Sequence, residues 1–222
     1  MCGRYTLKTR AEALAEHFEL PEVLWFEPRY NIAPAQPVAV VRASSEGGRR
    51  ELSMLRWGLI PSWADDPSIG NRMINARAET VAEKPAYRLA FRHRRCLVPA
   101  DGFYEWAKAN GAKQPHYFQL KDGGPFAFAG LWERWSKGEK PIESCTLLTT
   151  EANDVVSLVH DRMPIILEPK NYGGWLDPQR QRLEDVSAIL RPFPADRMVA
   201  YPVGRWVNEP QHDDPRCVEP AT

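Results

Sequence analysis

The sequence predicts an α+β fold of antiparallel strands joined by hairpins, with helices between groups of strands. Twenty prolines and fourteen glycines in 222 residues indicate many turns and short strands rather than a helical bundle. Turn sequences at 110–111 (Asn-Gly) and 122–124 (Asp-Gly-Gly) separate apolar runs, which is typical of hairpins. Such an arrangement favours α+β over a parallel α/β sheet. No composition break divides the chain, so we expect one domain over residues 1–222, with a polar tail from about residue 208.

The chain is expected to open with a short strand at 3–7, followed by a helix. Thr9 and Glu12 have the spacing of a capping box, in which the threonine side chain caps the helix. Leu14 and Phe18 lie four residues apart and would share the buried face of that helix.

The later elements follow from apolar runs with period 2 or 3.6, bounded by Gly, Pro, Asn or Asp. Strands are expected at 38–42, 52–57, 96–99, 102–106, 116–120, 126–132, 145–150, 163–167 and 198–203. Helices are expected at 86–93, 151–159 and 183–190. The irregular segment 58–71 is long, which favours a functional loop.

Charge and cysteine content limit the class of protein. Lys+Arg and Asp+Glu are both 29, so nucleic-acid binding would need a local patch and not a basic whole surface. The four cysteines form no CxxC pair, so no zinc ribbon or thioredoxin-type site is indicated. The chain has no signal peptide and no apolar run of about 18 residues, so we expect a cytoplasmic protein without a membrane span.

Cys2 is the first candidate for chemistry. If Met1 is removed, this residue carries an α-amine and a thiol on adjacent carbons. The amine can condense with an aldehyde to an imine, and the thiol can then close a thiazolidine ring. The ordinary pKa values, about 7.7–8.0 for the amine and about 8.5 for the thiol, leave part of each group nucleophilic near neutral pH. The plain alternative is that Cys2 is only the residue after the initiator.

Glu105 and His160 are candidates for proton transfer. Glu105 lies among aromatic residues in the segment 102–106, where desolvation would raise its pKa toward neutrality. His160 lies at an expected helix-to-strand junction, and histidine is well suited to proton transfer near pH 7. The alternatives are an outward-facing strand glutamate and an ordinary loop histidine.

Asn75, Arg77 and Glu79 would share one face of an extended segment. An amide and a guanidinium on one face could hold a hydroxyl and a phosphate. The alternative is a solvated strand face on which arginine and glutamate pair.

Tryptophans and arginines complete the candidate site. Trp57 and Trp63 could stack on nucleobases or pack in the core, and Trp63 is the better stacking candidate because it lies in the irregular segment. Arg4, Arg77 and Arg162 each follow a proposed chemical residue by two positions: Cys2, Asn75 and His160. This pattern indicates a substrate that is guided by its phosphates.

Seven segments occur in the order of one known family: MCGRY at 1–5, RYNIAP at 29–34, RWGLIP at 56–61, INARAET at 74–80, ADGFYEW at 100–106, HDRMP at 160–164 and PV at 202–203. With these segments the chain resembles the SOS response-associated peptidase (SRAP) family, whose members shield abasic sites in single-stranded DNA. The resemblance covers nearly the whole chain. It departs in the loop after Trp63, which is followed by Ala64 and not by a second tryptophan.

The resemblance implies a single α+β domain with antiparallel sheets curled into a barrel-like core and helices outside. It implies that Cys2 captures the ring-opened aldehyde of an abasic site, with Asn75, Glu105 and His160 as the other active-site residues. Glu105 would handle protons at the Cys2 amine, His160 would assist sugar-ring opening, and Asn75 would hold Cys2 and the sugar. The implied DNA contacts are Arg4, Pro34, Trp63, Arg77 and Arg162. The resemblance implies no metal and no cofactor.

Three functions are therefore weighed. The leading one is an abasic site processing protein, a monomer, that crosslinks covalently to single-stranded DNA, shields the lesion, and can act as a lyase, reverse its crosslink or remove its own Met1. The bound protein would be associated with the nucleoid. The second is a cysteine-type peptidase with Cys2 as nucleophile and His160 as base. The third is a non-catalytic binder of single-stranded DNA, which the zero net charge disfavours.

Overall fold

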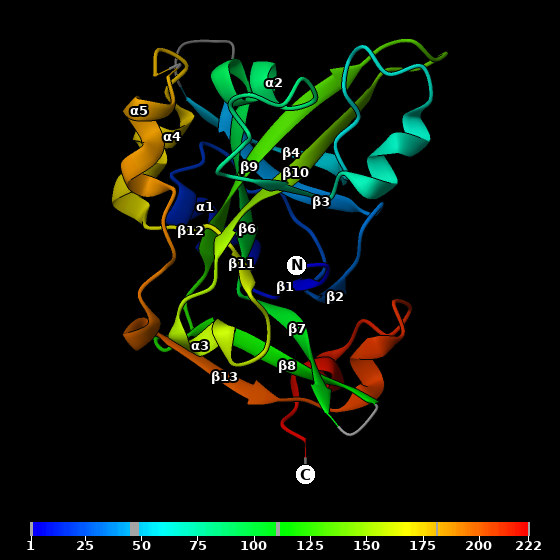
Figure 1. Cartoon of the computed structure of the whole chain (residues 1–222), viewed down its shortest axis with the longest axis vertical. Coiled ribbons are helices and arrows are strands. Elements are labelled where there is room, and N and C mark those ends of the chain that lie inside the picture. Colours follow the sequence, from blue (N-terminus) through cyan, green and yellow to red (C-terminus); the bar gives the residue numbers. More distant parts are fainter. Residues whose placement is uncertain (1, 45–48, 110–111, 181, 222) are drawn as a thin grey trace.

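Two sheets organise the chain in the computed structural model, which describes residues 2–44, 49–109, 112–180 and 182–221. The first sheet has the strand order β13-β8-β7-β1-β2. Its strands are β1 (Tyr5–Leu7), β2 (Arg29–Ile32), β7 (Gly102–Ala109), β8 (Ala112–Leu120) and β13 (Met198–Pro202). The strands β7, β8 and β13 lie in the lower part of the molecule in Figure 1.

The second sheet closes on itself as a barrel. Its order is β11-β10-β4-β3-β6-β9-β12, and a further pairing between β10 and β9 joins the ends of a five-stranded ring. The ring strands are β3 (Pro37–Ala43), β4 (Arg50–Trp57), β6 (Arg95–Ala100), β9 (Phe126–Trp135) and β10 (Ile142–Glu151). The strands β5 (Asn75–Arg77), β11 (Arg162–Pro164) and β12 (Ile166–Leu167) add to its edges.

Short helices lie outside the sheets, as the fold class predicts. They are α1 (Ala11–Phe18), α2 (Arg88–His93), α3 (Asp154–Ser157), α4 (Tyr172–Leu176) and α5 (Leu183–Val186). Helices α4 and α5 lie along one side of the barrel (Figure 1). The predicted α+β fold with a barrel-like core and peripheral helices is confirmed. The pairing is not wholly antiparallel, because β10 runs parallel to both β4 and β5.

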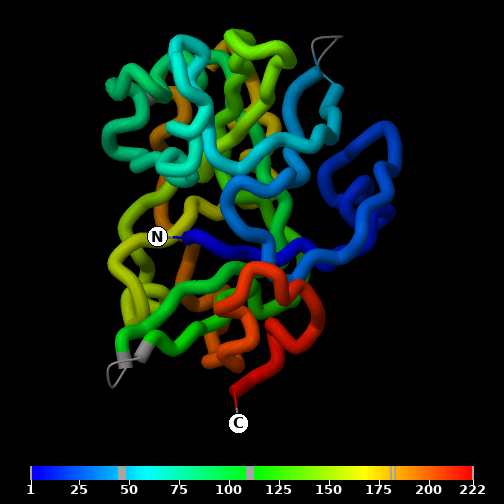
Figure 2. Tube along the Cα trace, turned by 90° about the vertical axis from the view of Figure 1, so that its right-hand side faces the viewer, coloured from blue at the N-terminus to red at the C-terminus, as the bar shows by residue number. Residues whose placement is uncertain are grey.

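The barrel interior is apolar, and β1 ties it to the first sheet. All six residues of β6 are buried. Tyr5 of β1 packs edge-on against Trp57 and Phe128, with ring centroids 5.3 Å and 5.7 Å apart. Figure 2 shows the N-terminal strand in blue between the barrel above and the β7–β8 hairpin below. The start of the chain therefore lies between the two sheets.

The capping box predicted for the first helix is wrong. The residue that precedes α1 is Arg10, which makes no side-chain cap, and Leu14 and Phe18 are buried as expected. The hydroxyl of Thr9 instead donates to Asp101, whose carboxylate also accepts from the backbone N–H groups of Lys8 and Thr9. A buried carboxylate supplied by β6–β7 thus takes the threonine away from the helix.

Several later elements are shorter than predicted or are divided. Residues 151–159 contain one helical turn, α3, because β10 continues through Glu151 and Asn153 caps the turn by accepting from the Val156 N–H at 3.0 Å. Residues 183–190 form α5 followed by a 3-10 turn. The strand expected at 163–167 is divided between β11 and β12. The Asn-Gly turn predicted at 110–111 lies outside the described residues.

The polar segment after Asn208 folds back onto β2. Buried Asn31 donates to the carbonyls of Val207, Glu209 and His212 at 3.1, 3.0 and 2.7 Å. Asp213 accepts from the backbone N–H of Asn31 at 2.8 Å. Cys217 is fully buried in a satellite cluster that also contains Tyr104 and Tyr117.

In the described part of the chain no helix combines the length and apolar character needed to cross a membrane. The same residues contain no group of three or more His, Cys, Asp or Glu side chains that could hold a metal ion.

Candidate active site

Cys2 lies immediately before β1 and is fully buried. Its position is set by β1, in which Tyr5 pairs with Ile32 on one side and with Phe103 on the other. The Sγ atom donates to the Arg4 carbonyl at 3.7 Å. Burial and then the nearby Glu105 carboxylate raise the pKa of the Cys2 thiol well above its ordinary value. The thiol therefore stays protonated at neutral pH until the site opens or changes charge.

Asn75 holds Cys2 from the barrel side. It begins β5, which lies parallel to β10 with Asn75 opposite Leu147. Its Nδ2 donates to the Cys2 carbonyl at 2.8 Å. Its Oδ1 is buried and accepts no hydrogen bond within the described residues. A buried acceptor without a donor costs free energy, so this atom is an available acceptor beside Cys2.

Glu105 lies in the middle of β7 and is almost fully buried. Burial raises the pKa of this carboxyl group, and the charge of His160 partly opposes that shift. The predicted direction of the Glu105 pKa shift agrees with this environment. The charge of Glu105 in turn raises the pKa of the Cys2 thiol, so Cys2, Glu105 and His160 influence one another electrostatically.

His160 follows α3 and precedes β11, at the junction that the sequence indicates. Its Nδ1 accepts from the Arg162 backbone N–H at 2.9 Å and lies 3.0 Å from the exposed carboxylate of Asp161. These two contacts require opposite roles of Nδ1 in the neutral ring. We assign Nδ1 as the acceptor because a backbone N–H can only donate, which places the proton of the neutral imidazole on Nε2.

Two hollows lie on either side of this group. The Glu105 hollow, of about 540 Å³, is lined by Arg4, Glu105, Trp106, Lys108, Lys113, His160 and Asn208. The Asn75 hollow, of about 450 Å³, is lined by Trp63, Asn75, Ala76, Arg77, Thr80, Lys84, Pro85, Ala86 and Tyr87. A larger hollow of about 680 Å³ contains none of the candidate residues. Cys2 is linked to the first hollow through Glu105 and to the second through Asn75.

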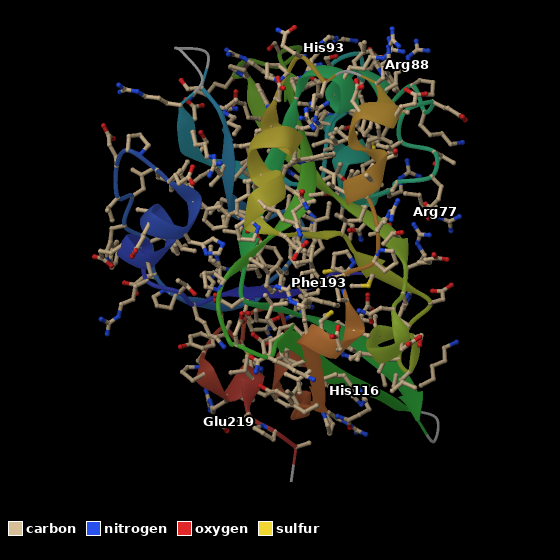
Figure 3. All side chains as sticks on the ribbon, turned by 90° about the vertical axis from the view of Figure 1, so that its left-hand side faces the viewer. Arg77, Arg88, His93, His116, Phe193 and Glu219 are labelled. Carbon is tan, nitrogen blue, oxygen red and sulfur yellow. The ribbon has the colours of Figure 1, made fainter. Side chains whose placement is uncertain are left out.

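The three candidate arginines have different surroundings. Arg4 donates to Asn31 Oδ1 and to the Val207 carbonyl, both at 2.9 Å. Arg162 forms a two-pronged ion pair with Glu79 at 2.6 and 2.9 Å, and also donates to the Thr149 carbonyl at 2.8 Å. Arg77 is exposed at the margin of the molecule (Figure 3). Of the three, Arg77 is therefore the one whose guanidinium faces solvent.

The aromatic and proline candidates also separate. Trp57 is fully buried and donates to the Ile74 carbonyl at 2.9 Å, so it is a core residue. Trp63 is 52% exposed and lines the Asn75 hollow. Pro34 is half-buried and lines neither of the two hollows.

The structure adds residues that the sequence did not indicate. Tyr87 donates to the Asn75 carbonyl at 3.4 Å and lines the same hollow, and burial raises its pKa to about 12. Thr149 supports Arg162 from β10. Neither residue stands in a distinctive motif, since Tyr87 lies beside an expected helix and Thr149 in an apolar strand. Glu79 was considered only as a partner for an arginine on its own face, whereas its partner is Arg162.

Known proteins match this chain over nearly its whole length. Residues 1–210 match the family model described as SOS response associated peptidase (SRAP). "Abasic site processing protein YoqW" of Bacillus subtilis is 42% identical over 224 residues, covering 99% of each chain. "Abasic site processing protein YedK" of Escherichia coli is 30% identical and covers 100% of both.

A further relative and two solved structures also match the chain. "Abasic site processing protein HMCES" of Gallus gallus is 32% identical over 88% of this chain and 67% of its own. A crystal structure of a protein from Bacteroides thetaiotaomicron superimposes with a TM-score of 0.89 at 26% identity, covering 100% of both chains. One from Bordetella bronchiseptica gives 0.76 at 31% identity, covering 91% of this chain and 100% of its own. With the segment order, the fold and these matches in agreement, the chain belongs to the SOS response associated peptidase (SRAP) family.

Proposed function

We propose that this protein processes abasic sites in single-stranded DNA by a covalent crosslink through Cys2, after loss of Met1. The observation that carries the proposal is the placement of Cys2. Asn75 donates a hydrogen bond to the Cys2 carbonyl at 2.8 Å, and the Cys2 thiol is close enough to Glu105 for the carboxylate charge to raise its pKa. The names of the relatives support abasic sites as the substrate. Single-stranded DNA is favoured because the sugar must open to an aldehyde that reaches a buried residue.

The proposed chemistry uses no cofactor and has two steps, imine formation and ring closure. The Cys2 amine adds to the C1 aldehyde of the ring-opened deoxyribose, and the resulting carbinolamine loses water to give an imine. The thiol then adds to the imine carbon, its proton passing to the nitrogen, and a five-membered thiazolidine closes. Because burial and Glu105 raise the pKa of the Cys2 thiol, the amine is the first nucleophile.

The neighbouring side chains have complementary roles in this proposal. Glu105, whose pKa is raised by burial, retains a protonated fraction at higher pH than an exposed glutamate and can give a proton to the departing water. In its cationic form, His160 passes a proton to the ring oxygen as the deoxyribose opens and is left as the neutral imidazole. The open acceptor Oδ1 of Asn75 receives the Cys2 amine or a sugar hydroxyl. Arg77 and Trp63 would meet a phosphate and a base at the Asn75 hollow.

Lyase and peptidase activities compete with this scheme in different ways. The same imine could lose the 3′ phosphate by β-elimination, which would make the protein a lyase. A cysteine peptidase instead needs a histidine nitrogen that accepts the thiol proton. The sulfur donates to the Arg4 carbonyl, and the imidazole nitrogen that accepts is already bonded to the Arg162 N–H. These contacts favour crosslinking over general peptidase activity.

The direct test mixes purified protein with a single-stranded oligonucleotide that carries one abasic site. Intact mass first establishes that Met1 is absent, and denaturing gels then detect the adduct. The wild type should give an adduct with the mass of protein plus DNA minus one water, and Cys2→Ala should give none. Cys145→Ala, which removes another buried thiol, is the control and should react like the wild type. No adduct from Met1-free wild type would refute the proposal.

A further inference from the structure

Two lysines face each other on the hairpin that carries Glu105. In the β7–β8 register, Lys108 lies directly opposite Lys113. Both are exposed, and within the described residues neither ammonium group makes a hydrogen bond or an ion pair. Like charges at directly opposite positions destabilise an antiparallel pair, since the Cβ atoms are only about 4.5–5.5 Å apart. The hairpin therefore retains a repulsive pair that folding does not explain.

The position of this pair indicates what it is for. Both lysines line the Glu105 hollow, together with the candidate proton-transfer residues Glu105 and His160. The one arginine of that hollow, Arg4, is committed to Asn31 and to two carbonyls of the C-terminal segment. The lysines are thus the solvent-facing cations of this hollow among the described residues.

The opposite side of Cys2 has its own cations. Arg77 and Lys84 line the Asn75 hollow, and both are exposed. A strand whose lesion lies at Cys2 would leave the site in two directions, one across each hollow. The backbone on the Glu105 side needs cations that are free to bind it, and Arg162 is taken by Glu79 and Thr149.

We propose that Lys108 and Lys113 bind the phosphates of the DNA strand on the Glu105 side of the lesion. The inference rests on the proposed function and extends it, since it gives the strand a second anchoring point across the site from Arg77. Two ammonium groups on flexible stems can reach one phosphate or two adjacent phosphates. Binding of the phosphates relieves the repulsion that the free protein retains.

The test compares two double variants with the same change in net charge. Lys108→Gln/Lys113→Gln removes the proposed clamp. Lys121→Gln/Lys170→Gln is the control, because Lys121 follows the other end of β8 and Lys170 pairs with Glu168. Both variants and the wild type are measured with a fluorescent, undamaged single-stranded oligonucleotide over a range of salt concentrations.

Each phosphate contact on a single strand contributes a slope of about −0.7 to log K against log salt. Loss of two contacts should make the slope of the Lys108→Gln/Lys113→Gln variant shallower by about 1.4. The affinity ratio of wild type to this variant should then be about 25 times larger at 0.1 M salt than at 1 M. The control should keep the wild-type slope. Equal slopes for the two double variants would overturn the proposal.

Two further measurements separate this inference from the crosslinking chemistry. Adduct formation with glycolaldehyde, followed by intact mass, should be unchanged in the clamp variant, whereas crosslinking to abasic DNA should fall about as much as binding does. The clamp variant should also melt about 1–3 °C higher, because the repulsion is gone. If wild type reacts with neither aldehyde nor abasic DNA, the proposed function fails, and the salt slope still decides the role of the lysines.

Discussion

At the scale of single residues, the site depends on groups that burial has changed. Glu105 is a carboxyl group in an apolar strand, and Cys2 is a thiol beside that carboxyl group. Each would be more easily ionised in water, so the fold holds both toward their neutral forms. Side chains with shifted pKa values of this kind are common at functional sites.

The raised pKa of Glu105 predicts how stability depends on pH. A carboxyl group whose pKa is higher in the folded state binds its proton more tightly when folded. Its contribution to stability is therefore full below the ordinary glutamate pKa of about 4.3 and is lost as the pH rises through the raised value. We expect Glu105→Gln to melt about 1–3 °C above wild type near pH 8, with no difference near pH 4.

Thermal melts across that pH range check this prediction, with Glu16→Gln on the exposed face of α1 as the control. The same variant should crosslink abasic DNA more slowly, because glutamine cannot donate or accept the proton of the carboxyl group. A Glu105→Gln protein that is less stable than wild type at high pH would contradict the burial argument.

At the scale of elements, the Glu79–Arg162 pair joins the chain after β5 to β11. Both strands flank β10, and Arg162 also contacts Thr149 of β10. The side chain of Arg162 is only 15% exposed, and these partners take up its hydrogen-bond donors. The pair thereby holds the Asn75 and His160 segments in a fixed relation.

Glu79→Gln and Arg77→Gln should separate structural from DNA-binding roles on this edge. Glu79→Gln should lower the free energy of unfolding by about 1 kcal/mol, a value limited by the half-exposed carboxylate. Arg77→Gln should change it by less than about 0.5 kcal/mol, as is usual for an exposed residue. Crosslinking should fall several-fold in Arg77→Gln. Urea unfolding and initial crosslinking rates measure both effects, and the opposite ranking of stabilities would reject this assignment.

At the scale of the whole molecule, the C-terminal segment packs against the first sheet. The family match ends at residue 210, yet Asp213 and Cys217 lie beyond it and are packed against β2 and the satellite cluster. Arg4, two residues after Cys2, donates to the carbonyls of Val207 and Asn208 in the same region. The end of the chain therefore supports the strand that presents Cys2.

Removal of residues 209–222 should destabilise the protein as a whole. The truncation removes the carbonyls of Glu209 and His212, which accept hydrogen bonds from buried Asn31, and it removes the buried side chain of Cys217. A loss of about 4 kcal/mol, from three or four such interactions, corresponds to a melting temperature about 8–16 °C lower. Calorimetry would measure it, with Asp213→Ala expected at an intermediate value. A truncated protein that melts with the wild type would show that this segment does not support β1.

The predicted elements succeeded where local signals suffice. Apolar runs located the barrel strands, and Leu14 and Phe18 are buried on α1 as their spacing predicts. The helix predicted at 151–159 and the Thr9 cap failed because β10 and Asp101 compete for those residues. These competitors are about 90 residues away in the case of Thr9, so no local pattern reports them.

The sequence alone identified the chemical groups that are available: a cysteine at position 2, which becomes an aminothiol if Met1 is removed, a carboxylate among aromatics, and a histidine at a junction. It also determined the α+β class, because strand periodicity and turn residues are local properties. Which cations face solvent could be learned only from the folded structure. Arg4 and Arg162 are committed to distant acceptors, whereas Arg77 and the Lys108–Lys113 pair are not. A long charged side chain takes its partner from whatever the fold brings near it, and that depends on contacts between residues far apart in the sequence.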